Sequence, residues 1–190
     1  MVIVQADTIV LPPGLTIELA ASGVQMVLKR PPAKVSDARI ERLTDADAAE
    51  MLALATLTKP GPFTLRAQAL GEFFGVKEEG RLVAMAGERM KEVGFTEVSG
   101  VCVHPDFRRR GLGRLLSVFM THRVLEHGET PFLHAFATNS AAIGLYESIG
   151  FELRTMMNVA MVRAESASQT AQGSHTSTVA SRPEAGTSSY

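Results

Sequence analysis

The chain has 190 residues, of which 45% are hydrophobic, and its formal net charge at pH 7 is -1. This length and composition fit one globular domain that buries a core without disulfides or structural metal ions. The near-neutral charge argues against a nucleic-acid-binding protein, because such proteins usually carry a basic excess on one face. Cys102 is the sole cysteine, so no internal disulfide framework can form, and a reducing compartment is favoured.

Targeting and membrane segments are not evident in the sequence. Residues 1–14 lack the basic start and long apolar run of a secretory signal. No apolar stretch approaches the roughly 20 residues that a membrane-spanning helix needs. We therefore expect a cytoplasmic protein without a membrane partner.

Residues 1–34 are interpreted as a strand extension packed on the main domain. Residues 16–19 and 24–28 have the composition of two short strands, and Pro12-Pro13-Gly14 predicts a turn. Arg30-Pro31-Pro32 is interpreted as the connector that leads into the main domain.

The main domain is expected to span residues 35–163. Thr44 and Asp47 stand just before an alanine-rich segment, where a hydroxyl can cap free N–H groups and a carboxylate suits the helix dipole. From Leu112 onward, apolar residues recur with helical spacing. In chain order we expect a strand at 38–43, helices at 48–57 and 64–70, strands at 73–77, 82–86 and 96–103, a helix from 112 that ends at Gly128, a strand at 132–137, a helix from 140 to 149, and one or two strands within 151–162.

Residues 164–190 differ sharply in composition from the rest of the chain. They are rich in Ser, Thr, Ala, Gly and Gln and contain almost no large apolar side chains. Because such a segment buries too little to offset the entropy of ordering it, we expect a disordered tail.

A strand, a basic loop and the start of a helix follow one another in residues 101–114. A helix N-terminus leaves about four backbone N–H groups unpaired and carries partial positive charge, so it attracts anions. Gly111 and Gly113 lack side chains that would keep a phosphate from this backbone. Leu116 stands where a dinucleotide fingerprint needs its third glycine, and no mononucleotide P-loop is present. A solvated basic turn is the alternative. The basic residues are Arg108, Arg109, Arg110 and Arg114.

Two motifs of the chain resemble those of the GNAT superfamily of acetyl-CoA-dependent N-acetyltransferases. Arg108-x-x-Gly111-x-Gly113 resembles the Arg/Gln-x-x-Gly-x-Gly/Ala signature, whose loop binds the pyrophosphate of acetyl-CoA in that family. Residues 131–151 resemble the second family motif, Asn-x-x-Ala-x-x-x-Tyr-x-x-x-Gly-Phe. Both occur in the family's order and spacing, and a weaker likeness extends from residue 38 to residue 162. The second motif is represented here by Asn139, Ala142, Tyr146, Gly150 and Phe151.

The resemblance implies an α+β fold, with a mixed, mostly antiparallel central sheet flanked by helices. Residues 35–163 would form the GNAT domain, and the parallel strands 96–103 and 132–137 would splay apart to admit the pantetheine arm of the cofactor. Backbone groups of Val101 and Val103 would bind this arm and the acetyl carbonyl. No metal site is expected. The full set of residues expected to contact acetyl-CoA is Val101, Cys102, Val103, Arg108, Arg109, Arg110, Gly111, Leu112, Gly113, Arg114, Asn139 and Tyr146.

Acetyl transfer to an amine needs a neutral amine, donors to the thioester oxygen and stabilisation of the departing thiolate. The resemblance implies that Tyr146 is the acid, since a phenol with a reference pKa of about 10 stays protonated at neutral pH; the alternative is a tyrosine that only packs on the sheet. Glu97 and His134 are candidate bases, although each could be a structural strand residue and a water chain could replace both. Ser99 shares a strand face with Glu97.

We therefore expect direct transfer of an acetyl group from acetyl-CoA to an unidentified primary amine through a ternary complex. The alternative is a non-catalytic acyl-CoA-binding regulatory module. Nucleic-acid binding through residues 108–114 is disfavoured by the overall charge. We expect acetyl-CoA and the amine as partners, no nucleic acid, and a monomer or homodimer. Acceptor specificity is expected to lie in residues 44–75, with residues 59–63 as a candidate part of the pocket.

Overall fold

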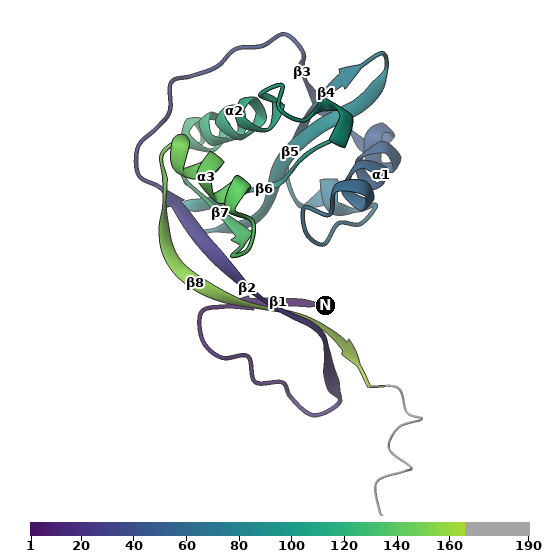
Figure 1. The fold of residues 1–190 in the computed structure, drawn as a ribbon, viewed down its shortest axis with the longest axis vertical. Helices are drawn as coiled ribbons and strands as arrows, with labels where there is room; N and C mark the ends of the chain where they lie inside the picture. Colours follow the sequence, from purple (N-terminus) through teal and green to yellow (C-terminus); the bar gives the residue numbers. More distant parts are fainter. Residues whose placement is uncertain (166–190) are drawn as a thin grey trace, which may run out of the picture.

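An eight-stranded β-sheet organises residues 1–165, the part of the chain that the computed structural model describes (Figure 1). Its strand order is β1-β8-β2-β7-β6-β5-β4-β3. The predicted tail lies outside the described residues from residue 166 onward. The strands are β1 (Val2–Gln5), β2 (Leu15–Leu28), β3 (Ile40–Leu43), β4 (Phe73–Glu78), β5 (Arg81–Glu92), β6 (Phe95–Val103), β7 (Thr130–Phe136) and β8 (Phe151–Ala164). The helices are α1 (Ala48–Thr58), α2 (Leu112–Glu126) and α3 (Ser140–Ser148), with short 3-10 helices η1 (Asp45–Asp47), η2 (Ala67–Leu70) and η3 (Pro105–Phe107).

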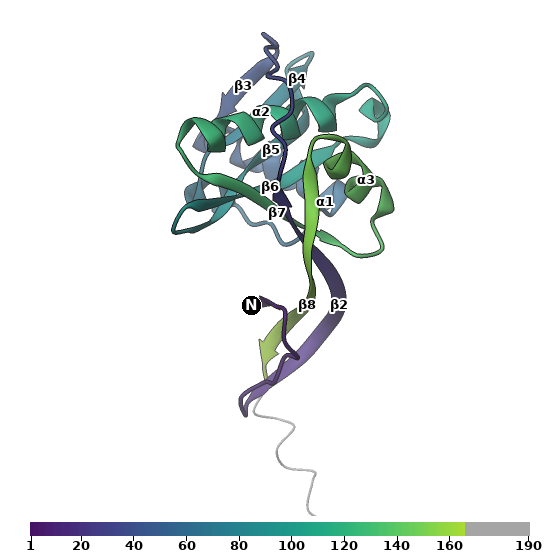
Figure 2. The same ribbon diagram turned by 90° about the vertical axis from the view of Figure 1, so that its left-hand side faces the viewer.

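The predicted α+β class is confirmed, because neighbouring strands are antiparallel everywhere except between β6 and β7. Helix α1 covers one face of the sheet, and α2 and α3 cover the other (Figures 1 and 2). Thr44 begins η1 with the predicted capping box, in which its backbone N–H donates to Asp47 Oδ2 over 2.8 Å. The second predicted helix, at 64–70, is shorter than expected and forms only the 3-10 turn η2.

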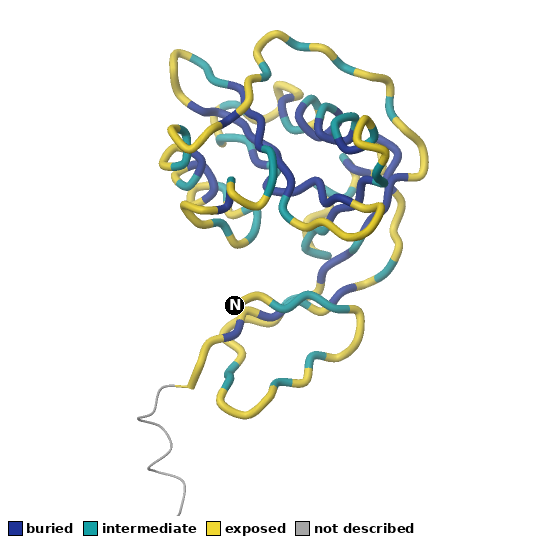
Figure 3. The backbone as a smooth tube through the Cα atoms, turned by 180° about the vertical axis from the view of Figure 1, so that it is seen from behind, coloured by how far each residue is buried: buried dark blue, intermediate teal, exposed yellow. Residues whose placement is uncertain are grey.

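The long helix α2 packs through the apolar stripe that its sequence predicts. Leu112, Leu116, Met120 and Val124 are all buried, and they contact apolar side chains of β4, β5 and β6. The backbone view coloured by burial shows the same division, with buried segments in the central strands and exposed ones in the loop between β1 and β2 (Figure 3). Within residues 1–165, no helix is long and apolar enough to cross a membrane.

The N-terminal strand β2 corrects the prediction of two short strands at 16–19 and 24–28. It is continuous over 14 residues, because β8 pairs along its whole length, from Leu15 opposite Ala164 to Leu28 opposite Phe151. This pairing satisfies the backbone groups of the polar and small residues that appeared to separate the two runs. Strand β2 also pairs with β7 and therefore lies inside the sheet, while the boundary at residue 34 stays a prediction.

The outer halves of β2 and β8 extend beyond the helices as a twisted arm (Figures 1 and 2). Strand β1, which the sequence analysis did not predict, pairs with β8 at the edge of this arm, with Val2 opposite Met161. The arm thus brings the two ends of the described chain together beside the rest of the sheet.

A β-bulge in β6 decides which of its side chains face α1. Met85 lies opposite Cys102 and Gly87 lies opposite Ser99, so β6 has one more residue than β5 in this interval. Gly100 adopts a φ of +63°, a left-handed conformation that glycine enters without strain. The extra residue turns Cys102 toward α1, whereas Val98 packs on the α2 side.

Candidate active site

The site begins where β6 and β7 stop pairing. Their parallel register covers only three positions, of which the last places Glu97 opposite Phe132. Farther along β6, the His104 N–H donates to Val83 O over 2.8 Å, toward β5. Because alternate residues of a strand direct their backbone groups to opposite sides, Val103 and Val101 direct theirs toward β7. Within residues 1–165, the β6–β7 pairing ends before Val101 and Val103, so their backbone groups line the gap between the two strands.

The predicted basic loop lies at the end of β6 and leads into α2. Gly111 is the N-cap of α2 with a φ of +77°, and no side chain caps the helix. Leu112 is buried and anchors the first turn in the core. The exposed arginines around it are Arg108, Arg109, Arg110 and Arg114. None of them forms an ion pair with an acidic residue within residues 1–165, so their charge and the free N–H groups are available to an anion.

The fold itself does not require a glycine at position 113. A Cβ added to Gly113 would lie 3.6 Å from Val103 Cγ2 and 3.8 Å from Leu145 Cδ2, which are ordinary contact distances. The bare backbone at this position instead keeps open the space next to the first N–H groups of α2. This is where a phosphate would approach the helix.

Helix α3 supplies Asn139 and Tyr146. Asn139 is the N-cap, and its Oδ1 accepts a hydrogen bond from the Ala142 N–H over 3.1 Å, so its side-chain amide N–H groups stay available. Tyr146 is buried and packs edge-on against Phe151. Burial and, to a smaller extent, the nearby Glu97 carboxylate together raise the pKa of Tyr146 to about 12. The phenol is therefore protonated at neutral pH and can act as a donor.

Cys102 belongs to the core beneath α1. Burial raises the pKa of its thiol to about 11, while a hydrogen bond with Thr58 opposes the rise. A protonated, buried thiol is a poor nucleophile. Among the residues predicted to contact the cofactor, Cys102 has the least support, because its side chain packs against α1 and its backbone is directed toward β5.

Glu97 and His134, predicted from separate strands, contact each other across the start of the gap. His134 Nδ1 lies 3.0 Å from Glu97 Oε1, and His134 Nε2 lies 3.0 Å from Gln25 Nε2. Arg154 Nη1 donates to Gln25 Oε1, so the amide of Gln25 must present an N–H to the imidazole. His134 consequently carries its proton on Nδ1, and this N–H donates a hydrogen bond to Glu97 Oε1.

Gln25 and Arg154 were missed in the sequence analysis. Gln25 interrupts an apolar run of β2, and strand periodicity alone puts it on the opposite face from Val24 and Met26. The sequence therefore placed Gln25 on a separate face of the strand, but its hydrogen-bond partner His134 is 109 residues away. Nothing local in the sequence pairs the two side chains.

A cavity of about 360 Å³ adjoins the Glu97–His134 pair. Its walls come from the loop after α1, from β5, and from β1 and β8 of the arm. The loop lies within the region 44–75 that was predicted to hold the acceptor, whereas the arm was not expected to contribute. Glu97, His134 and Arg89 are charged or ionisable residues in the wall, and the apolar lining includes Pro60, Pro62, Met90, Phe136, Met157 and Val159.

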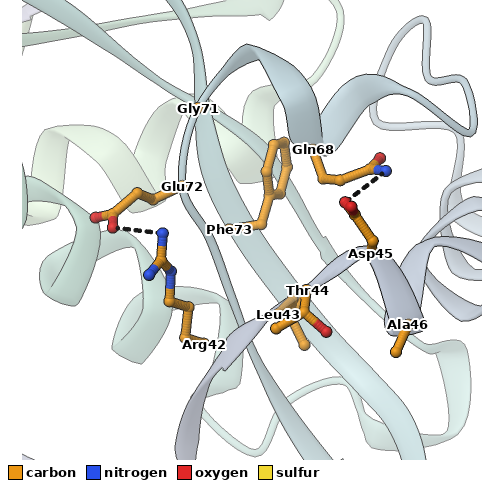
Figure 4. Close-up of a pocket in the computed structure, with 9 residues that line it drawn as sticks. All are labelled: Arg42, Leu43, Thr44, Asp45, Ala46, Gln68, Gly71, Glu72 and Phe73. Atoms are coloured by element: carbon orange, nitrogen blue, oxygen red, sulfur yellow. Dashed lines mark hydrogen bonds and ion pairs between the residues drawn. The ribbon is translucent and has the colours of Figure 1, made fainter.

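A second cavity, of about 430 Å³, lies between β3 and η2, near the opposite edge of the sheet (Figure 4). Its polar side chains pair with one another, as Arg42 Nη2 lies 3.1 Å from Glu72 Oε1 and Gln68 Nε2 donates to Asp45 Oδ1 over 3.3 Å. Most of its lining belongs to the region 44–75 that was predicted to hold acceptor specificity, but none of the predicted catalytic or cofactor-binding residues lines it. Within residues 1–165, no group of three or more His, Cys, Asp or Glu side chains could hold a metal ion.

Comparison with known proteins adds to this geometry. The family model of FR47-like proteins matches residues 73–160. A [ribosomal protein bS18]-alanine N-acetyltransferase from Salmonella typhimurium is 38% identical over 94 residues, covering 44% of this chain and 64% of that protein. The Escherichia coli K12 protein of the same name is 35% identical over 86 residues, covering 44% of this chain and 56% of that protein. The chain therefore spans less than two thirds of the length of these curated relatives.

Solved structures extend the likeness to the whole fold. The ribosomal-protein-S18-alanine N-acetyltransferase from Escherichia coli shares the fold, with a TM-score of 0.55 and 23% identity over 68% of this chain and 96% of that one. An acetyltransferase of the GNAT family from Novosphingobium aromaticivorans superposes with a TM-score of 0.82 and 38% identity, covering 87% of this chain and 75% of that one. From this extent of shared sequence and structure, the chain belongs to the GNAT family.

Proposed function

We propose that this protein is an N-acetyltransferase that moves an acetyl group from acetyl-CoA directly to a primary amine within a ternary complex. The observation that carries the proposal is the Glu97–His134 pair, which lies at once at the mouth of the β6–β7 gap and in the wall of the adjoining cavity. The gap between β6 and β7 suits acetyl-CoA, and the adjoining cavity suits the amine. The Glu97–His134 pair lies between the two.

The donor would be held by backbone and charge rather than by a dedicated side-chain pocket. The N-terminus of α2 and its arginines suit the pyrophosphate. The backbone groups of Val101 and Val103 suit the pantetheine arm, since an extended amide chain can pair with an open strand edge. Acetyl-CoA supplies the acetyl group as a thioester, and the residues described here orient it and move protons.

Glu97 is the better supported of the two candidate bases. In the tautomer that the Gln25 and Glu97 contacts require, His134 donates from Nδ1 to Glu97 and accepts from Gln25 at Nε2, so both ring nitrogens are engaged. Glu97 Oε2 is buried and has no hydrogen-bond partner within residues 1–165. This oxygen can accept the proton of the amine, while His134 holds the other carboxylate oxygen in place. His134 is thus a positioning residue in the proposed reaction.

The transfer then needs one bond to form and one to break. The amine nitrogen attacks the thioester carbonyl carbon, Glu97 takes a proton from the nitrogen, and the carbon–sulfur bond breaks. Tyr146 suits the last step, because a phenol with a pKa raised to about 12 remains protonated and can give its proton to the departing thiolate. The products are the N-acetylated amine and CoA.

Isothermal titration with acetyl-CoA, with free CoA as the control, tests the donor half of the proposal. We expect micromolar binding, followed by acetyl-CoA-dependent thiol release when primary amines are added. Binding without thiol release for any amine class would leave a non-catalytic acyl-CoA-binding module as the better description. Absence of binding at millimolar acetyl-CoA would contradict the proposal as a whole.

A further inference from the structure

Arg89 places a fixed cation in the wall of the cavity beside Glu97. Its Nε donates to Ser99 Oγ over 2.6 Å, and its Nη1 donates to Pro62 O over 2.6 Å. The first bond ties the guanidinium to β6, and the second ties it to the loop after α1. Within residues 1–165, Nη2 makes no hydrogen bond and Arg89 forms no ion pair with an acidic side chain.

The surroundings of this guanidinium leave its charge without a counter-ion. The neighbouring lining of the cavity is largely apolar and includes Pro60, Met90, Phe136 and Met157. A partly buried cation is costly unless an anion pairs with it, and a planar guanidinium pairs best with a carboxylate. Glu97, the acidic group in the same wall, forms no ion pair with Arg89, and its Oε1 is bound to His134.

The spacing between Arg89 and Glu97 limits the size of an acceptor that could reach both. Arg89 is anchored on Ser99, which follows Glu97 by two residues on the same face of β6. Two residues of a strand span about 6.6 Å. Because Arg89 is anchored one strand-face position from Glu97, an acceptor that bonds to both side chains needs its amine and its carboxylate close together, as in an α-amino acid.

We propose that Arg89 binds the carboxylate of the acceptor, and that the acceptor is an α-amino acid with an apolar side chain. The amine would then face Glu97, the carboxylate would face Arg89, and the side chain would lie against Met90, Met157 and Pro60. This inference rests on the proposed acetyltransferase function, because it assigns the second substrate of that same site.

Steady-state thiol release with L-leucine and L-leucinamide as acceptors tests the assignment. The two compounds share the amine and the side chain, but only leucine carries the carboxylate. For the wild-type protein we expect kcat/KM to be at least tenfold higher for leucine. Arg89→Met should raise the KM for leucine by tenfold or more, while kcat changes little and leucinamide kinetics stay within about twofold.

Two further variants separate charge from structure. Arg89→Lys retains the cation and should recover part of the affinity for leucine. Ser99→Ala removes one anchor of the guanidinium and should weaken leucine binding less than Arg89→Met does. If Arg89→Met lowers kcat/KM equally for leucine and leucinamide, Arg89 only holds the Pro62 loop in place. That result would overturn the inference.

A binding measurement that does not depend on turnover completes the test. N-acetyl-L-leucine should bind the wild-type protein more tightly than N-acetyl-L-leucinamide, and Arg89→Met should abolish this preference. No preference in the wild-type protein overturns the role of Arg89, whatever the kinetics. If acetyl-CoA binds and leucinamide or a peptide N-terminus is acetylated as well as leucine, the proposed function stands and this inference fails. If acetyl-CoA does not bind at all, the proposed function fails first.

Discussion

Glu97 and His134 join β6 to β7 at the last position where these strands are paired. Glu97 lies opposite Phe132 in the parallel register, and His134, two residues farther along β7, places Nδ1 3.0 Å from the carboxylate. Beyond this contact the strands part. The hydrogen bond therefore holds a buried carboxylate at the point where the proposed donor gap meets the proposed acceptor cavity.

Replacing this carboxylate should remove most of the activity. Glu97→Gln preserves the shape of the side chain and its contact with His134 but cannot accept a proton from the amine. We expect kcat to fall by about 100-fold or more, as for the loss of a general base. The measurement is thiol release at saturating acetyl-CoA.

Acetyl-CoA affinity, measured by isothermal titration, is the control for Glu97→Gln and should be unchanged. His134→Ala should cost less than Glu97→Gln, because His134 is expected to position the carboxylate rather than to take the proton. A larger loss for His134→Ala would reverse these two roles.

Tyr146→Phe separates the proposed acid role of the hydroxyl from the packing role of the ring. The ring stays in contact with Phe151, so the fold should be retained, while the hydroxyl that serves the thiolate is lost. We expect a fall in kcat of about 100-fold with little change in the KM for acetyl-CoA. An unchanged kcat would assign thiolate protonation to another group.

Two glycines of the α2 loop should respond differently to a methyl group. Gly113→Ala fits the folded protein and should leave the thermal midpoint nearly unchanged, while acetyl-CoA affinity should fall about tenfold or more because the methyl group would occupy the proposed path of the phosphate. Gly111→Ala forces a side chain into a φ of +77° and should lower the free energy of unfolding by about 1–2 kcal/mol. Unchanged acetyl-CoA affinity in folded Gly113→Ala would remove the loop from the donor site.

Gly150, although part of the second sequence motif, is expected to matter for folding rather than for cofactor binding. Its φ is +97°, and an added Cβ would lie 1.8 Å from Arg30 O. The Gly150 carbonyl also accepts the N–H groups of Lys29 and Arg30. Gly150→Ala should therefore destabilise the protein by on the order of 3 kcal/mol, as measured by urea unfolding. A variant with wild-type stability would contradict the close approach of the 29–30 backbone.

Alkaline pH should destabilise the fold through two buried groups. Burial raises the pKa of Cys102 from 9.0 to about 11. It also raises the pKa of Tyr146, from 10.0 to about 12. Each group holds its proton more tightly in the folded state, so the unfolded chain loses protons first as the pH rises. The free energy of unfolding is thus at its full value below the ordinary pKa of each group and falls as the pH rises toward the folded value.

The loss amounts to up to about 2–3 kcal/mol for each group. Urea unfolding curves recorded below and above the ordinary thiol pKa of 9.0 measure it. The double variant Cys102→Ala, Tyr146→Phe should show a shallower alkaline decline than the wild-type protein. Equal slopes would mean that neither burial changes the proton affinity of its group.

Features that depend on neighbours along the chain could be read from the sequence. The apolar spacing after Leu112 predicts α2, Thr44 and Asp47 predict the capping box, and the helix predicted from residue 140 is α3. The loop 108–114 leads into the helix start as predicted, while its role as an anion site stays a prediction. In each case the physical cause, a turn, a cap or a side-chain period, acts within a few residues.

The way in which distant segments meet could not be predicted from local patterns. The continuity of β2 follows from pairing with β8, whose residues lie more than 100 positions away, and no local pattern records that partner. The bulge at Gly100 sets which side chains of β6 face α1, because one extra residue reverses the alternation of a strand. The contacts of His134 with Gln25 and of Arg89 with Pro62 arise from the same packing. The local elements and the family motifs could be read from the residues alone, whereas the proposed acceptor cavity depends on the sheet order, because its walls come from segments that only folding brings together.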